Sequence, residues 1–318
     1  MEKIEFFLNK NKSRLKETVK DIVLFSNSYS MLSLYTDTTI VKSPEVTARG
    51  KFSSQSNRFI GEEFLLNYRT NTKLLGFRMG INRYSEREAV LADCHDELRE
   101  DTTDSISLPK PKFIKTSLST AIIHRRSIRE YSGRSMSLED LSTLLYYADG
   151  ISGEFKFIIS EGDEEVKKLR TAPSAGGMYP IDLYVVALNI QNLQKGLYQY
   201  YPYHNSLKPV ENSLSDSKIR NFAEFGEIEL SKANFILLYV YNFYVNSLKY
   251  GDSAVAYTLI EAGEISQNLQ LAANCIGYGA CDIGGYNKVY IEKSLSLDGV
   301  SQHVIHLTIV GKKKGEQQ

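Results

Sequence analysis

The chain has no tryptophan and only three cysteines among its 318 residues, and these absences limit the classes of protein it can belong to. Cys94, Cys275 and Cys281 are an odd number and form no C-x-x-C pair, so we expect neither a disulfide framework nor a metal site. This cysteine usage fits a reducing cytosol. Net charge is also absent, because 38 basic residues balance 38 acidic ones, and no global field attracts nucleic acid or an anionic membrane.

Long apolar runs are missing as well. The longest, over residues 235–245, is interrupted by Asn242 and is typical of a buried strand, so no transmembrane segment is expected. The N-terminus carries charges throughout and lacks an apolar core with a small-residue cleavage site, so we expect no signal peptide and a cytoplasmic location. The remaining balance, 42% hydrophobic and 24% charged residues, is that of a soluble globular protein.

A change in composition divides the chain. Residues 98–117 are first charged, then rich in serine and threonine, and then contain Pro109 and Pro111, which is typical of a linker. We place a boundary near residue 115, between an N-terminal extension (1–115) and a larger domain (116–318). The extension is expected to be mainly helical, with helices over residues 5–25 and 59–68, and its position would allow it to dock a partner or a peptide.

The larger domain shows signals for both helices and strands. Residues 137–140 resemble a capping box, and the apolar spacing after them predicts a helix ending at Gly150. Asp252 could cap a long helix that ends at Gly277, with Leu259 in its apolar stripe. The mixture predicts an α+β domain. Strands are expected over residues 181–190, 196–201, 207–210, 235–245 and 304–310.

Four basic or hydroxyl side chains lie within five residues: Arg125, Arg126, Ser127 and Arg129. Forked guanidinium donors at this density are suited to hold a phosphate and neighbouring hydroxyl groups. The alternative is the basic end of a short helix over residues 118–125, where cations are favoured.

A loop of small residues, Ala172 to Pro180, precedes the strand predicted over 181–190. Its two glycines would let the backbone approach a flat ligand, and its prolines would stiffen it. A plain turn before a strand would have the same composition, and composition alone favours that alternative.

Lys249 and Tyr250 stand between a predicted buried strand and the long helix. A lysine beside a tyrosine could form an acid–base pair, because a nearby ammonium lowers the pKa of a phenol. The alternative is a surface lysine next to a tyrosine that only packs.

Two further segments are rich in glycine or lysine. Residues 277–286 contain four glycines, which suits close approach of the backbone to a ring system, but the spacing is not that of a Rossmann fingerprint. Residues 311–314 are a glycine followed by three lysines, either a solvated tail or a second phosphate contact.

In this order, the segments PSAGGMYP, LKYG and GYG…GGY resemble those of the SagB-type dehydrogenases of the nitroreductase superfamily, over roughly residues 117–314. The resemblance implies a nitroreductase-like fold and bound FMN at a homodimer interface. It implies catalysis by Lys249 and Tyr250. The flavin-binding residues that it implies are Arg125, Arg126, Ser127, Arg129, Pro173, Ser174, Ala175, Gly176, Ile283, Gly284, Gly285 and Lys312.

The resemblance also implies an activity: oxidation of thiazoline or (methyl)oxazoline rings in a ribosomally made peptide to thiazoles or (methyl)oxazoles, in a complex with cyclodehydratase subunits. Two alternatives remain. One is a general NAD(P)H-dependent nitro- or quinone reductase on the same fold, and the other is a non-catalytic scaffold subunit of a cyclodehydratase complex.

Overall fold

The computed structural model describes residue 61, residues 64–65, residue 68, and residues 75–84, 87–160 and 163–314. The chain divides into two compact units between Asn71 and Thr72, and the second contains the strands and helices from α5 onward. The helix predicted over residues 5–25 lies outside the described residues. Of the helix predicted over residues 59–68, positions 61, 64 and 65 are helical.

A seven-stranded sheet in the order β1-β6-β5-β4-β7-β9-β8 forms the centre of this unit. All its neighbouring strands are antiparallel. A separate hairpin joins β2 to β3. The strands are β1 (Ile106–Ser107), β2 (Ile151–Ser160), β3 (Asp163–Arg170), β4 (Ile181–Ala187), β5 (Gly196–Tyr201), β6 (Ser206–Glu211), β7 (Phe235–Asn242), β8 (Tyr278–Asp282) and β9 (Gln302–Lys312).

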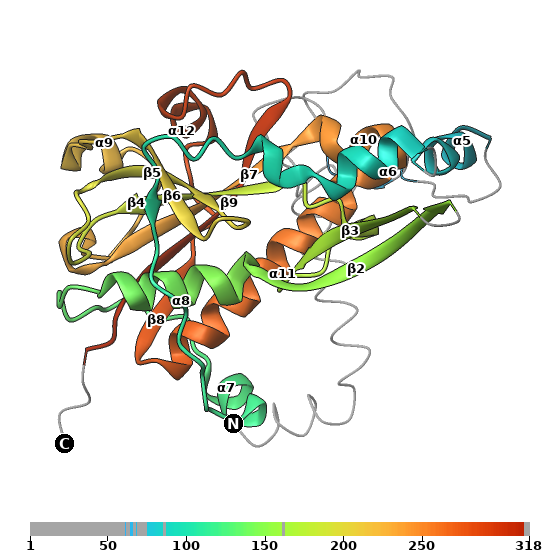
Figure 1. Cartoon of the computed structure of the whole chain (residues 1–318). Coiled ribbons are helices and arrows are strands. Elements are labelled where there is room, and N and C mark those ends of the chain that lie inside the picture. The colour runs from blue at the N-terminus through green and yellow to red at the C-terminus, as the bar shows by residue number, and fades with distance from the viewer. Residues whose placement is uncertain are drawn as a thin grey trace, which may run out of the picture. The chain divides into compact units, whose positions relative to one another are not determined.

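Helices cover both faces of the sheet (Figure 1). From residue 75 onward, the α-helices are α5 (Leu75–Arg83), α6 (Arg87–Cys94), α7 (Leu118–His124), α8 (Leu138–Asp149), α9 (Asp216–Arg220), α10 (Phe243–Tyr250), α11 (Ser253–Cys275) and α12 (Lys288–Ser294). Short 3-10 helices are η1 (Asp96–Arg99), η2 (Ala175–Gly177) and η3 (Leu230–Lys232).

Strand β7 illustrates why the sheet needs cover on both faces. Leu237 and Tyr239 join one apolar cluster with residues of α8 and α11, whereas Ile236 and Leu238 join a second with residues of α9 and α12. Side chains alternate along a strand, so a continuous apolar run feeds both clusters. The predicted α+β fold is confirmed.

Three predictions of local secondary structure are confirmed. The Ser137 side chain accepts a hydrogen bond from the Asp140 backbone N–H and starts α8, which ends before Gly150. The predicted hairpin is β5–β6, and α7 is the predicted short helix. All three cysteines are unpaired. No helix in the described part of the chain is long and apolar enough to cross a membrane.

Two local predictions were wrong. The strand predicted to reach residue 245 ends at Asn242, whose backbone N–H donates to the Pro180 carbonyl, and the chain then turns into α10. Lys249 and Tyr250 therefore end a helix rather than follow a strand. Asp252 precedes α11, but its side chain makes no capping hydrogen bond, because its backbone is already helical.

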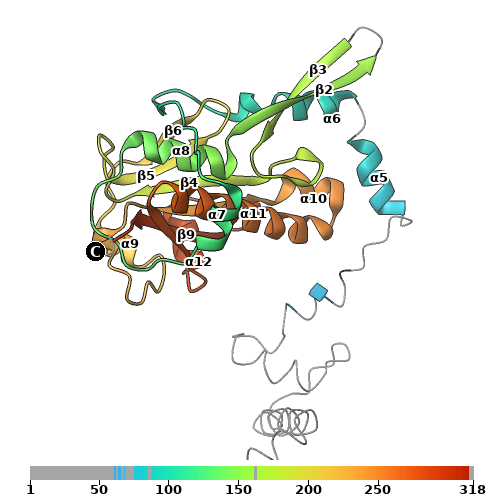
Figure 2. The same cartoon turned by 90° about the horizontal axis from the view of Figure 1, so that it is seen from below.

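The described part of residues 75–115 packs within the same compact unit as the sheet. Helix α6 lies along the β2–β3 hairpin (Figure 2). Helix α5 lies so close to α10 that a Cβ on Gly80 would be 2.5 Å from the Lys249 carbonyl oxygen. Strand β1 pairs with the edge strand β6. The boundary near residue 115 stays a prediction about where the family-like part of the chain begins.

Candidate functional site

The loop between β3 and β4 contains two consecutive residues in the left-handed region, Gly176 (φ +64°) and Gly177 (φ +65°). This conformation favours glycine. The backbone N–H of Gly177 donates to the Ser174 carbonyl, and that of Tyr179 donates to the Ser174 side-chain oxygen, at 2.9 Å each. The loop is therefore a fixed turn that presents bare backbone.

This turn lies against the end of α10. A Cβ on Gly176 would be 2.4 Å from the Tyr250 hydroxyl oxygen and 2.6 Å from the Lys249 Nζ. A side chain at position 176 would therefore require the ends of these two side chains to move. Two motifs far apart in the sequence thus meet, and the predicted pair faces the predicted loop.

Aromatic rings surround the Lys249 ammonium. It lies 5.2 Å from the centre of the Tyr84 ring and 5.3 Å from that of Tyr250. Burial lowers the pKa of Lys249 and raises that of Tyr250. The nearby ammonium thus does not lower the pKa of the phenol, and of the two groups it is the lysine whose pKa is shifted toward neutrality.

A buried carboxyl group lies beside the same loop. Glu261, on the buried face of α11, accepts a 2.6 Å hydrogen bond from the Ser174 hydroxyl. Burial raises the pKa of Glu261 to about 8, although the bond from Ser174 opposes this. Glu261 is thus largely protonated near neutral pH and adds little negative charge to the site.

Replacing Glu261 with glutamine is expected to change how stability depends on pH. The folded-state pKa of about 8 exceeds the ordinary value of 4.5, so the folded state holds a proton that the unfolded state releases between these limits. This stabilisation is complete below pH 4.5 and is lost as the pH rises to about 8. Relative to the wild type, the glutamine variant should gain at most about 1.4 kcal/mol per pH unit over this window. Urea unfolding at several pH values across the window measures the difference, and a flat difference would contradict the assignment.

The arginine-rich segment is attached to the edge of the sheet beside β8. Ser127 forms a parallel bridge with Ala280, and the Ile128 N–H donates to the Ala280 carbonyl at 3.0 Å. A Cβ on Gly279 would be 2.4 Å from the Ile128 Cβ. Because Gly279 has no side chain, Ile128 of the arginine-rich segment can pack directly against its backbone. This corrects the interpretation that its close approach serves a ring system.

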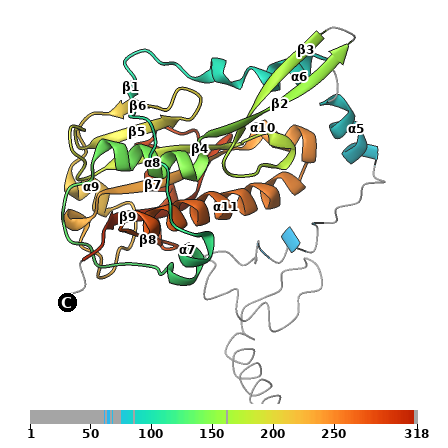
Figure 3. The same ribbon diagram turned by 60° about the horizontal axis from the view of Figure 1, so that its bottom comes forward.

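Helix α7 lies beside α11 (Figure 3), and two cationic side chains contact the second half of α11. Arg125 donates to the Gln270 side-chain oxygen at 3.0 Å, and Lys313 donates to that of Asn274, one turn later, at 2.6 Å. In the part of the chain that the structure describes, neither forms an ion pair with a carboxylate. An anion such as a phosphate would complete this donor set.

The other predicted flavin ligands are dispersed. Arg126 donates to the carbonyls of Ile123 and Arg125. Arg129 lines a cavity of about 400 Å³ that holds three glutamates and two lysines, and Arg125 does not line this cavity. Lys312 lies over the Tyr278 ring, 4.2 Å from its centre.

Residues 283–285 lead away from β8 toward α12. The Ile283 N–H donates to the Leu307 carbonyl, and the Gly285 carbonyl accepts from the Glu224 N–H. Around Gly284 there is open space: a Cβ there would meet no atom within 4 Å. The backbone at Gly284 therefore has space beside it for a ligand.

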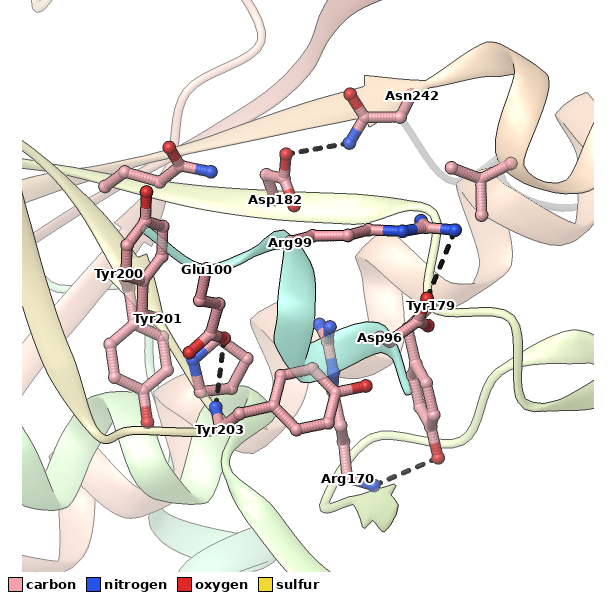
Figure 4. A pocket seen from close by; sticks show the side chains of 13 residues that line it. Asp96, Arg99, Glu100, Arg170, Tyr179, Asp182, Tyr200, Tyr201, Tyr203 and Asn242 are labelled. Carbon is pink, nitrogen blue, oxygen red and sulfur yellow. Dashed lines mark hydrogen bonds and ion pairs between the residues drawn. The ribbon is translucent and has the colours of Figure 1, made fainter. Parts of the chain in front are cut away.

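A polar cavity of about 230 Å³ adjoins the candidate loop (Figure 4). Tyr179 and Arg170 contribute to its lining, and the Arg170 guanidinium forms a buried 2.7 Å ion pair with Asp149. Glu100 enters from the segment after α6 and accepts hydrogen bonds from the backbone N–H groups of Tyr203 and His204, at 3.0 and 3.2 Å. The cavity thus lies between η1 and the end of the sheet. Neither residue of the predicted acid–base pair lines it.

A model of the nitroreductase family matches residues 122–312, more than half of the sequence. The chain belongs to the nitroreductase family. The predicted resemblance to this superfamily is confirmed.

Individual proteins give further comparisons. MJ1384 of Methanocaldococcus jannaschii, named as a nitroreductase, is 26% identical over 66% of this chain and 98% of its own length. The microcin B17-processing protein McbC of Escherichia coli is 32% identical over 41% of this chain and 49% of McbC, and it supports the SagB-type branch.

Solved structures show the nitroreductase fold. A protein of Ralstonia eutropha JMP134 described as a nitroreductase has a TM-score of 0.54 and 25% identity, over 68% of this chain and 93% of that one. The E. coli microcin synthetase McbBCD complex with truncated pro-MccB17 bound has a TM-score of 0.50 and 22% identity, over 86% of this chain and 95% of that one. At this identity the second likeness shows the fold alone.

Sequence reasoning missed some residues of the candidate site. Glu261 carried a usable signal, because a carboxylate one turn before Ile265 and two before Leu269 falls on the buried face of the helix. Lys313 was not missed, because it is one of the three C-terminal lysines offered as a phosphate contact, although Lys312 was the one chosen. Tyr84 carried no signal, since its contact with Lys249 depends on chain segments far apart in the sequence.

Proposed function

We propose that this nitroreductase is an FMN-dependent dehydrogenase of the SagB type, which oxidises thiazoline or (methyl)oxazoline rings in a peptide to the aromatic azoles. The observation that carries the proposal is the Lys249–Tyr250 pair held against the bare backbone of Gly176. The match to McbC supports the same proposal.

The donor set of this chain fits FMN. Arg125 and Lys313 offer two cations without a carboxylate partner among the described residues, as a phosphate requires. We propose that Arg126, Ser127, Arg129 and Lys312 contribute nearby, and that Pro173, Ser174, Ala175, Gly176, Ile283, Gly284 and Gly285 present backbone to the ring system. When bound, FMN would supply a hydride acceptor, with molecular oxygen as the final oxidant.

The chain's own residues would handle the proton. Oxidation of an azoline removes one proton and one hydride from adjacent ring carbons, so the site needs a base. Neutral Lys249 suits this role, because burial lowers its pKa toward the working range. The Tyr250 hydroxyl would then orient the ring. The Gly176 turn keeps both groups at one edge of the loop.

Partners are part of the proposal. Apolar side chains on α7 and α11, among them Leu118, Ile123 and Ile260, are 59–68% exposed. Such a surface is expected to be covered, and we propose that a second copy of this chain covers it, with a cyclodehydratase bound elsewhere. Sedimentation equilibrium measures the mass of the assembly. The three unpaired cysteines fit a cytoplasmic enzyme.

The decisive experiment supplies the flavin-loaded chain with an azoline-containing peptide, alone and with cyclodehydratase subunits, and records the mass of the peptide. The expected result is a loss of two hydrogens per ring. Rapid flavin reduction by NAD(P)H with no change in peptide mass would instead favour a general nitroreductase, as in the match to MJ1384. A chain that binds no FMN but is required for ring formation would favour the scaffold role.

A further inference from the structure

A second lysine lies beneath the same turn. Lys167 of β3 is 3% exposed, and its ammonium is paired with the Asp93 carboxylate of α6. A Cβ on Gly177 would be 3.0 Å from the Lys167 Cε and 3.4 Å from its Nζ. Lys167 and Lys249 therefore approach successive glycines of one turn, from two separate elements of the fold.

The segment directly after Asp93 holds this carboxylate in place. His95 forms a 3.3 Å contact with Glu165 of β3. Glu100 is fixed by the backbone N–H groups of Tyr203 and His204, at the cavity drawn in Figure 4. Helix α6 is thus attached on one side to the hairpin and on the other to the sheet, so the Asp93 carboxylate has little freedom to leave Lys167.

The groups that face Lys249 come from every element around it. Tyr84 follows α5, Asp93 is on α6, Lys167 is on β3, and Tyr250 is its neighbour on α10, with the Tyr257 ring of α11 packed behind. Asp93 raises the pKa of Lys249 and Lys167 lowers it. The two members of the ion pair thus shift the pKa of the Lys249 ammonium in opposite directions.

We propose that Asp93 and Lys167 are positioning residues of the active site: their ion pair supports the Gly176–Gly177 turn and sets the charge around Lys249. The segment before residue 115 thereby supplies part of the catalytic environment. The inference rests on the proposed role of Lys249.

Two single variants separate this role from simple support of the fold. Lys167→Met leaves the negative charge of Asp93 facing Lys249, whereas Asp93→Asn leaves the positive charge of Lys167. Competitive acetylation of the flavin-loaded protein with acetic anhydride, read by peptide mass spectrometry, gives the titration midpoint of Lys249. We expect it to rise by about one pH unit in the first variant and to fall by about one in the second. The pH dependence of kcat for azoline oxidation should move in the same directions.

A merely structural pair would give no shift or shifts of the same sign, and either result overturns the inference. Opposite shifts in labelling without any azoline oxidation would keep the inference about charge and reject the proposed function. If a single variant fails to fold, because removal of one partner leaves a buried charge, the charge-swapped Asp93→Lys/Lys167→Asp protein retains a pair. Its Lys249 midpoint should differ from that of the wild type, and an unchanged midpoint overturns the inference.

Discussion

Replacing Lys249 with methionine is expected to lower kcat for azoline oxidation by about 10²- to 10⁴-fold, the usual contribution of a positioned general base. Methionine keeps much of the length and apolar stem of lysine, so the packing against Tyr84 and Gly176 should survive. Tyr250→Phe is expected to have a smaller effect, since burial raises the pKa of its phenol away from the working range. Loss of two hydrogens per ring, followed by mass spectrometry, measures both.

The control is Lys195→Met, which removes a lysine paired with Asp216, both outside the candidate site. Flavin content and melting temperature should be the same in all three variants. Full turnover of Lys249→Met with flavin bound would show that this lysine is not the base.

Gly176→Ala is expected to lower activity about a hundredfold or more, because a misplacement of about 1 Å can have that effect. The new Cβ would lie 2.4 Å from the Tyr250 hydroxyl and 2.6 Å from the Lys249 Nζ, so both groups must move. The positive φ adds a backbone strain of roughly 1–3 kcal/mol. Steady-state kinetics and urea unfolding separate the two effects.

Gly299→Ala is the matched control for Gly176→Ala. Its φ of +67° gives a similar backbone strain, but the nearest atom to its Cβ would be 3.9 Å away. It should lose stability to a comparable extent and retain its activity. Equal loss of activity in the two variants would mean that strain, rather than contact with the acid–base pair, accounts for the effect.

Local patterns predicted much of the fold, and their errors have specific physical causes. The apolar run that ends at Val245 crosses a boundary between strand and helix, and only the hydrogen bond of Asn242 to the Pro180 carbonyl shows where it lies. The predicted stripe of α11 included Leu259, which is 52% exposed, while Glu261 is buried. The helical period places Glu261 on the buried face with Ile265 and Leu269, but because apolar residues alone were used to define the stripe, Glu261 was left out and the exposed Leu259 was included.

The candidate site was predictable where its residues belong to recognisable motifs. The meeting of Gly176 with Lys249 and Tyr250 agrees with the family resemblance. Asp93 and Tyr84 could not be found in this way, because they reach Lys249 only through the packing of α5 and α6. Their side chains follow no spacing rule relative to the motifs.

Helix α11 has a consequence for the length of the ligand. Its first half carries Glu261 beside the candidate loop, and its second half carries Asn274, which accepts a hydrogen bond from Lys313. At a rise of 1.5 Å per residue these positions are about 20 Å apart along the axis. A continuous helix is stiff, so the proposed site for an anion and the proposed site for a reacting ring would stay at a fixed separation. A molecule that is too short or too long could contact only one of these two sites. Selection by length would therefore need no additional side chain.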